Sequence, residues 1–200
     1  MSKKLILLAG PTASGKSKLA IYLAKRFNGE IINADSMQIY KEFSILSSRP
    51  NSTEMKKVKH HLYGTISVKK YFSSGDWLKK AKKQIHLCLK RKKTPIIVGG
   101  TGLYFNAITK GISKIPDIDQ TTRNKVRNLY KKIGSKKFYS RLLKLDPKIK
   151  DKILPTDSQR LQRAYEVKLK TKKSLFQWFE NTKSDFLDFE IKKIFIDTPR

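Results

Sequence analysis

The chain has 200 residues, of which 38% are hydrophobic and 10% aromatic, which is enough to bury one sizeable core and excludes wholesale disorder. Its 45 Lys and Arg against 16 Asp and Glu give a formal net charge of +29. Such an excess attracts polyanions and favours a nucleic-acid partner, with a general bias toward lysine as the alternative explanation. The single cysteine, Cys88, excludes an internal disulfide framework and a cysteine metal site.

No apolar run approaches the ~18 residues of a membrane helix. The apolar segment near the N-terminus is too short for a signal peptide and has no cleavage site of small residues. We therefore expect a cytoplasmic protein that has no membrane partner. We also expect a monomer, although the sequence leaves the oligomeric state open.

The first hundred residues alternate strand and helix patterns. Apolar runs predict buried strands over Leu5–Ala9, Glu30–Ala34 and Pro95–Val98. Amphipathic patterns predict helices over Lys16–Phe27 and Trp77–Lys90. Strands that alternate with crossovers of this length indicate a parallel α/β sheet.

The strongest motif is a phosphate-binding loop between the first strand and the first helix. Its glycines let backbone N–H groups turn toward a diphosphate, and the helix N-terminus adds positive potential. Lys16 is expected to reach the terminal phosphate, and the Ser17 hydroxyl to ligate Mg²⁺. The residues of the loop are Gly10, Pro11, Thr12, Ala13, Ser14, Gly15, Lys16 and Ser17.

Beyond Gly111 the pattern is helical from about Ile118 to Lys183, and a strand returns at Lys193–Asp197. We therefore predict an α/β fold with a P-loop NTPase-like parallel sheet core and a helical insertion. The expected divisions are 1–115 for the first part of the core, 116–185 for the insertion and 186–200 for the return to the core.

Two carboxylates are candidates for chemistry. Asp35 ends the second predicted strand and should lie beside the phosphate loop, where open α/β sheets bind ligands. A carboxylate there can deprotonate a nucleophile, and a helix cap is the alternative role. Asp197 ends the last predicted strand, where a metal role and a simple turn before Pro199 both stay open.

Three further positions could contact an anion or a base. Thr101 follows Gly99 and Gly100 after the third strand and offers a hydroxyl. Arg123 begins the inserted helices, where it either closes over an anion or is a solvated surface residue. Around residue 160, three polar side chains share one helix face opposite Leu161. That face suits phosphates or base edges, although a plain amphipathic helix has the same pattern. The three are Gln159, Arg160 and Arg163.

Five segments together resemble the tRNA dimethylallyltransferase family. In chain order they are GPTASGKS, NADSMQIY, HHLYG, PIIVGGTGLYFNAI and DSQRLQRAYEV. The resemblance extends from Leu5 to Arg200 and implies transfer of a dimethylallyl group from dimethylallyl diphosphate to N6 of adenosine 37. This adenosine lies next to the anticodon of tRNAs that read codons beginning with U. The resemblance also implies Mg²⁺ and no need for ATP, despite the ATP-type loop.

The same resemblance implies roles for single residues. Asp35 corresponds to the general base toward the adenine N6 amino group, and Lys16 to the diphosphate-binding lysine. Thr101 and Arg123 correspond to positions that contact the tRNA or bracket the reaction centre. The segments that correspond to tRNA-contacting segments are Asp35, Ser36, Met37 and Gln38, and then Gln159, Arg160, Leu161, Gln162 and Arg163. We therefore expect the helical insertion to face tRNA.

The chain departs from the family pattern in two places. The family's Gly-Thr-Ala-Lys-Pro stretch is replaced by Leu46–Pro50. The family's later helices, which complete the core and help clasp the tRNA, have no counterpart, so we expect a diphosphate pocket but poor tRNA turnover. Two other functions stay open: a kinase of the P-loop class that acts on a nucleotide or small molecule, and a tRNA-binding fragment without activity.

Overall fold

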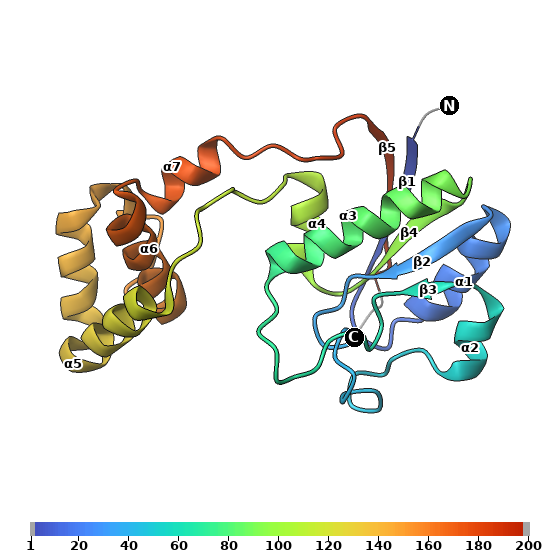
Figure 1. The fold of residues 1–200 in the computed structure, drawn as a ribbon, viewed down its shortest axis with the longest axis horizontal. Helices are drawn as coiled ribbons and strands as arrows, with labels where there is room; N and C mark the ends of the chain where they lie inside the picture. Colours follow the sequence, from blue (N-terminus) through green and yellow to red (C-terminus); the bar gives the residue numbers. More distant parts are fainter. Residues whose placement is uncertain (1–2, 198–200) are drawn as a thin grey trace. The chain divides into compact units, whose positions relative to one another are not determined.

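The computed structural model describes residues 3–197 (Figure 1). It divides the chain into two compact units. An α/β unit runs up to Gly111 and resumes at Ser184, and a helical unit comprises Ile112–Lys183.

The α/β unit is built on one five-stranded sheet with the strand order β3-β2-β4-β1-β5. Every neighbouring pair of strands is parallel. The predicted parallel α/β fold is thereby confirmed. The strands are β1 (Lys3–Ala9), β2 (Gly29–Asn33), β3 (His60–His61), β4 (Thr94–Gly99) and β5 (Phe189–Phe195).

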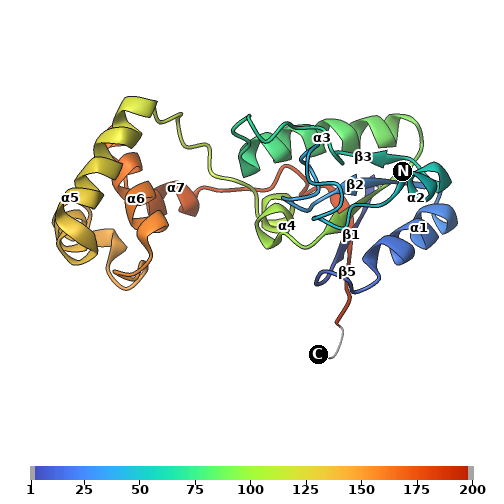
Figure 2. The same cartoon turned by 90° about the horizontal axis from the view of Figure 1, so that it is seen from below.

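Helices cover both faces of this sheet, with α1 and α3 on opposite sides (Figure 2). The apolar side chains of α3 recur every three or four residues, so they form one face that packs on the sheet. Trp77, Ala81, Ile85 and Cys88 on that face are fully buried. The helices of this unit are α1 (Lys16–Arg26), α2 (Ser52–Lys57), α3 (Ser74–Lys90) and α4 (Gly102–Thr109).

The last strand differs from the prediction. The sequence predicted a strand over Lys193–Asp197, but β5 begins at Phe189 and ends at Phe195, so those bounds are wrong. Its seven residues pair in register with all of β1. Because β5 lies at an edge of the sheet and is partly exposed, its sequence mixes Lys and Glu with apolar residues and gives a weak strand pattern. Asp197 follows the strand and is exposed.

The helical unit consists of α5 (Gln120–Leu145), a short 3₁₀ turn at Pro147–Ile149, α6 (Ser158–Thr171) and α7 (Leu175–Glu180). Gly134 interrupts α5 with φ 71° and ψ 169°, a backbone conformation that favours glycine. The second half of α5 packs Phe138 and Leu142 against Leu161 of α6, and all three are fully buried. Within residues 3–197, neither unit has a helix long and apolar enough to span a membrane.

Candidate active site at the carboxyl edge of the sheet

Three loops meet where β1, β2 and β4 end. Ala9 at the end of β1 lies opposite Gly99 at the end of β4, and Asn33 at the end of β2 lies opposite Val98. The chain segments that follow these strands therefore share the carboxyl edge of the sheet, where open α/β sheets bind ligands. These segments are the phosphate loop Gly10–Ser17, the turn at Ala34–Gln38 and the turn at Gly100–Thr101.

Glycines allow these segments to approach one another closely. A Cβ atom on Gly99 would lie 2.2 Å from the carbonyl oxygen of Ala34 and 2.8 Å from the amide nitrogen of Asp35. A Cβ atom on Gly100 would lie 3.5 Å from the carbonyl oxygen of Gly10 and 3.8 Å from Oδ2 of Asp35. The Gly99-Gly100 pair thus lies between the phosphate loop and Asp35, which brings two predicted site elements to one place.

The phosphate loop leads into α1 through Gly15, which has φ 80° and caps the helix without a side-chain hydrogen bond. The first turn of α1 contains no acidic residue. The positive end of the helix dipole is therefore not neutralised from within the helix, as an anion site requires. Ser17 lies in this first turn and is half-buried.

Lys16 is the cation of the loop. Its ammonium group donates to the carbonyl oxygen of Pro11 and, at 3.5 Å, to the hydroxyl of Ser14. Burial lowers the pKa of Lys16, and the negative charge of Asp35 acts in the opposite direction. The residue that the sequence assigned to proton transfer therefore lies close enough to the residue assigned to the diphosphate to act on the pKa of Lys16.

Asp35 uses one carboxylate oxygen in a turn. Its Oδ1 accepts the backbone N–H groups of Met37 at 2.9 Å and Gln38 at 3.4 Å. Among the residues that the structure describes, none donates a hydrogen bond to Oδ2, the oxygen nearest Gly100. Asp35 thus caps a turn rather than the helix that was its alternative interpretation, and it still offers a second oxygen to a proton donor.

Aromatic side chains that the sequence did not single out lie near Asp35. Tyr104 stacks on Trp77 with ring centroids 4.2 Å apart and an angle of 4° between the rings. Burial, together with Coulombic interactions with Tyr40 and Asp35, raises the pKa of Tyr104 to about 12. Burial and Asp35 also raise the pKa of Tyr63. Both hydroxyls therefore stay protonated near neutral pH. In the sequence, a buried aromatic residue beside a site looks the same as one that only packs in the core, so these tyrosines could not be identified there.

The other residues assigned to tRNA on or beside the Asp35 segment differ in whether their side chains are already hydrogen-bonded within the protein. The Thr101 hydroxyl oxygen accepts the N–H of Ser36 at 2.9 Å. The Gln38 amide nitrogen donates to the carbonyl oxygens of Ser47 at 2.9 Å and Ser48 at 3.3 Å. Gln38 therefore holds a neighbouring loop with its amide group, whereas the side chain of Met37 is 50% exposed.

The second predicted tRNA segment lies on α6 in the helical unit. Gln159 and Arg160 are exposed, and Gln162 and Arg163 are half-buried. Leu161 is fully buried in the core of the unit, so its side chain does not face solvent. Arg160 pairs with Asp157 at 3.4 Å and Arg163 with Glu166 at 3.5 Å, both on or beside the same helix. Arg123 lies in the first turn of α5 and is half-buried.

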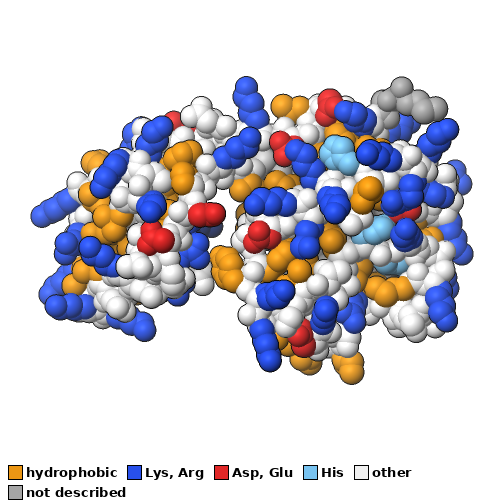
Figure 3. All heavy atoms as spheres, in the orientation of Figure 1, with side chains coloured by type: hydrophobic (Ala, Val, Ile, Leu, Met, Phe, Trp, Pro, Cys, Tyr) orange, Lys and Arg blue, Asp and Glu red, His pale blue; other side chains and the backbone are white. Residues whose placement is uncertain are grey.

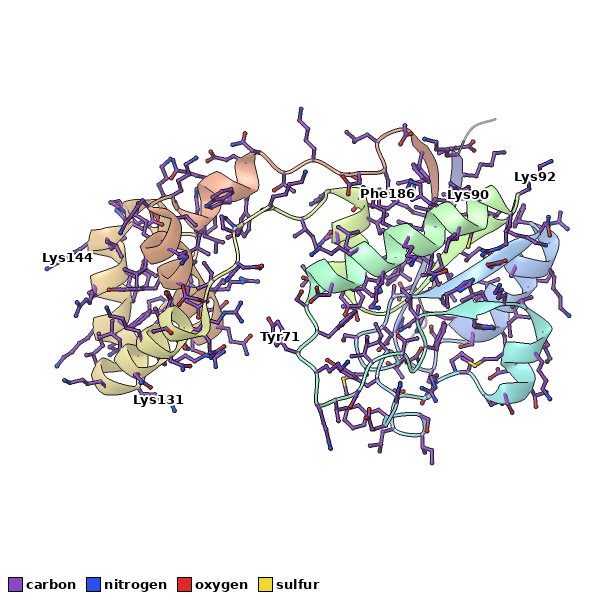
Figure 4. The ribbon with its side chains drawn as sticks, in the orientation of Figure 1. Tyr71, Lys90, Lys92, Lys131, Lys144 and Phe186 are labelled. Atoms are coloured by element: carbon purple, nitrogen blue, oxygen red, sulfur yellow. The ribbon has the colours of Figure 1, made fainter. Side chains whose placement is uncertain are left out.

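A second basic surface lies on the second half of α5, and we call it the α5 basic stripe. It is formed by four cations that line a groove of about 360 Å³ together with Ser140: Lys136, Lys137, Arg141 and Lys144. In the described part of the chain none of its four cations has an ion-pair partner, in contrast to both arginines of α6. Lys144 extends outward from α5 (Figure 4), and Lys and Arg side chains are spread over the visible surface, where few acidic ones appear (Figure 3).

An oxygen ligand suited to Mg²⁺ is present at the phosphate loop. The Ser17 hydroxyl is a hard oxygen donor in the first turn of α1, and Mg²⁺ commonly takes one or two protein ligands and completes its shell with phosphate and water. The described residues contain one group of three metal-type ligands, Glu30, His61 and Cys88. In that group Glu30 already contacts His61 at 2.6 Å and the Arg91 guanidinium at 2.6 Å, so it is an ion-pair network.

The chain is similar to known proteins over nearly its whole length. The family model described as "IPP transferase" matches residues 38–200. The chain is 55% identical to a tRNA dimethylallyltransferase from Pelagibacter ubique over 98% of its own length and 63% of that protein. It is 46% identical to a tRNA dimethylallyltransferase from Rickettsia massiliae over 99% of its own length and 55% of that protein. The chain thus spans about 60% of the length of these relatives.

Solved structures show the same fold. One describes a eukaryotic dimethylallyltransferase acting on tRNA. The match covers 99% of this chain and 49% of that one, with 30% identity and a TM-score of 0.84. Another is a tRNA delta(2)-isopentenylpyrophosphate transferase from Staphylococcus epidermidis, with 34% identity and a TM-score of 0.54 over 94% of this chain and 61% of that one.

Proposed function

The chain belongs to the IPP transferase family, and on that premise we propose that it transfers a dimethylallyl group from dimethylallyl diphosphate to N6 of adenosine 37 in tRNAs that read codons beginning with U. The observation that carries this proposal is the meeting of the phosphate loop with Asp35 at one sheet edge, across Gly99 and Gly100. A diphosphate site beside a carboxylate is what a transfer with a diphosphate leaving group and a proton-bearing nucleophile requires.

The phosphate loop binds the leaving group. The backbone N–H groups around Gly15 and the N-terminus of α1 face the diphosphate, and the Lys16 ammonium contacts its terminal phosphate. Ser17 would hold Mg²⁺ there, and the ion when bound neutralises part of the diphosphate charge. The bond between the dimethylallyl carbon and the diphosphate oxygen breaks, and its electron pair leaves with the diphosphate.

Asp35 serves the nucleophile. The N6 lone pair of adenine is delocalised into the ring, so removal of an N6 proton helps the nitrogen attack. We assign that proton to Oδ2 of Asp35, because Oδ1 accepts the N–H groups of Met37 and Gln38. The new bond joins N6 to the dimethylallyl carbon. The balanced result is a substituted adenosine, a diphosphate and one proton held by the carboxyl group.

The tRNA binds through two kinds of surface. Adenosine 37 must leave its stack to reach the sheet edge, as in other enzymes that modify bases, and we assign Thr101 and Met37 of the α/β unit to contact with this adenosine. Arg123 of the helical unit is assigned to contact with the tRNA substrate. The helical unit contacts the tRNA through the Gln159–Arg163 face and the α5 basic stripe, whose cations suit the phosphate backbone. We propose that the protein acts in the cytoplasm as a monomer.

A transfer assay tests this function directly. The purified chain is incubated with radiolabelled dimethylallyl diphosphate, unmodified tRNA and Mg²⁺, and label in the tRNA and released diphosphate are both counted. We expect label in the tRNA and tRNA-dependent diphosphate release. A kinase would instead convert ATP to ADP, and a binding module would show salt-sensitive tRNA affinity without any product.

A further inference from the structure

Asn33, the last residue of β2, has an unusual set of contacts for a residue outside the predicted site. Its side chain is fully buried. Its Oδ1 accepts the N–H of Asp35 at 2.9 Å, and its Nδ2 donates to the carbonyl oxygen of Asp35 at 3.0 Å. Nδ2 also donates to the carbonyl oxygen of Leu62 at 3.1 Å. One side chain therefore binds both polar groups of the Asp35 main chain.

These contacts fix Asp35 through two consecutive turns. Asn33 bonds the backbone two residues later, at Asp35, and Asp35 in turn bonds the backbone two residues later, at Met37. The first turn sets the direction of the Asp35 main chain, and the second sets the side chain so that Oδ1 is occupied. The oxygen that faces Gly100 is therefore Oδ2.

Asn33 is itself held by neighbouring elements. Its carbonyl oxygen accepts the indole N–H of Trp77 at 2.8 Å, and Trp77 stacks on Tyr104 of α4. Its amide group reaches Leu62, which follows β3. Because a buried amide destabilises the fold unless it is hydrogen-bonded, a fully bonded Asn at this point is a rigid connection between β3, α3 and the turn that carries Asp35.

We infer that Asn33 is a positioning residue, which orients the carboxylate of Asp35 for proton transfer; this rests on the proposed function, in which Asp35 is the base. A purely structural asparagine is the competing explanation. The two differ in what a variant changes: a positioning residue lowers the rate of the chemical step through Asp35, whereas a structural one lowers stability alone.

The test uses single-turnover rates of labelled transfer with enzyme in excess. Asn33→Ala is expected to slow transfer about 100-fold, the effect of misplacing a catalytic group by roughly 1 Å, with the KM for dimethylallyl diphosphate unchanged. Asn33→Ser is expected to lose less, because its hydroxyl can still accept the Asp35 N–H. The matched control is Ser184→Ala, which removes a buried hydroxyl that bonds Ile108 and Phe186 in the same unit. This control is expected to lower thermal stability and leave the rate unchanged.

A double variant separates the two explanations. In the Asp35→Asn background the further change Asn33→Ala is expected to have no effect on the rate, because it acts only through the Asp35 carboxylate. Amide exchange at Asp35 and Met37 is expected to become faster in Asn33→Ala and to stay slow in Ser184→Ala. A full rate in a folded Asn33→Ala variant, a loss of about 100-fold or more in a folded Asn33→Ser variant, unchanged exchange, or additive losses in the double variant would overturn the inference alone. A wild-type chain without transfer, or an Asp35→Asn variant with full activity, would overturn the proposed function itself.

Discussion

The hydroxyl oxygen of Thr101 accepts the backbone N–H of Ser36 at 2.9 Å. This contact ties the glycine turn after β4 to the residue that follows Asp35 in the turn after β2. The backbone N–H of Thr101 also donates to the carbonyl oxygen of Ala34 at 3.2 Å. Both the side chain and the main chain of Thr101 are therefore hydrogen-bonded to the segment that carries Asp35. The hydroxyl hydrogen is still available to a substrate, so the tRNA-contacting role assigned to Thr101 and its structural role are compatible.

Lys16→Ala should abolish binding of dimethylallyl diphosphate, because the loop loses its charge-assisted contact with the terminal phosphate. Calorimetric titration with dimethylallyl diphosphate and Mg²⁺ measures this directly. Lys18→Ala is the control, since Lys18 is exposed on the same helix and is expected to leave binding unchanged. Normal turnover by the Lys16→Ala variant would contradict the phosphate-loop assignment.

Asp35→Asn should leave both substrates bound while the chemical step slows by about 10²–10⁴-fold, the usual contribution of a general base. The amide keeps an oxygen that can accept the N–H groups of Met37 and Gln38, so the turn is expected to persist. The measurement is the single-turnover rate beside the affinity for each substrate. If the rate is normal, Asp35 serves only as the cap of its turn.

Gly99→Ala should disrupt the edge where β2 and β4 end. Its Cβ atom would lie 2.2 Å from the carbonyl oxygen of Ala34, a backbone atom that cannot move without shifting Asp35. Gly102→Ala is the matched control, because a Cβ atom there meets nothing within 4 Å. We expect Gly99→Ala to lower the melting temperature and the transfer rate, and Gly102→Ala to change neither by much. Equal behaviour of the two variants would show that the close approach at Gly99 is not required.

The α5 basic stripe should contribute more to tRNA binding than the arginines of α6. Lys137→Ala with Arg141→Ala is expected to make the negative slope of log K against log salt shallower by about two, since each lost phosphate contact reduces its magnitude by about one. Arg160→Ala with Arg163→Ala is expected to weaken binding and flatten the slope less, because each arginine already pairs with an acidic residue of its own helix region.

The measurement for that comparison is tRNA affinity over a range of salt concentrations, with dimethylallyl diphosphate binding as a check on folding. Lys90→Ala with Lys92→Ala removes two exposed lysines from the α/β unit (Figure 4) and serves as the charge-matched control. A salt slope that drops equally in all three pairs would show that net charge alone, rather than the α5 basic stripe, attracts the tRNA.

Glu30 should make the stability of the α/β unit sensitive to acid. Burial acts to raise the pKa of Glu30, but hydrogen bonds from Arg91, His61 and Cys88 outweigh it and lower the pKa from 4.5 to about 2. A carboxyl group with a lowered pKa stabilises the fold above its unfolded value and loses that effect as the pH falls toward its folded value. The stabilisation, on the order of 3 kcal/mol, is therefore expected to disappear between about pH 4.5 and 2.

Urea unfolding at pH 7, 4 and 2.5 tests this expectation. Glu30→Gln should be less stable than the wild type at pH 7, and the difference should shrink as the pH falls. Glu180→Gln, which removes an exposed carboxylate, should differ little from the wild type throughout. A constant difference between Glu30→Gln and the wild type at all three pH values would contradict the ion-pair account.

The sequence predicted those features that depend on local patterns. The strands β1, β2 and β4 carry apolar runs, and the phosphate loop has its glycines and lysine within eight consecutive residues. Features that depend on distant partners were missed: Asn33 is recognisable only through its bonds to Asp35 and Trp77. Likewise β3 has two residues, too few for any periodicity, and its place beside β2 comes from the tertiary fold.

The most direct test of the central claim is the mass of the nucleosides released from tRNA after incubation with the chain, dimethylallyl diphosphate and Mg²⁺. We predict one adenosine next to the anticodon that carries a dimethylallyl group in place of an N6 hydrogen, formed without ATP and missing with the Lys16→Ala variant. Unmodified adenosine together with intact dimethylallyl diphosphate, under conditions in which the chain is folded and binds tRNA, would contradict the proposed transfer.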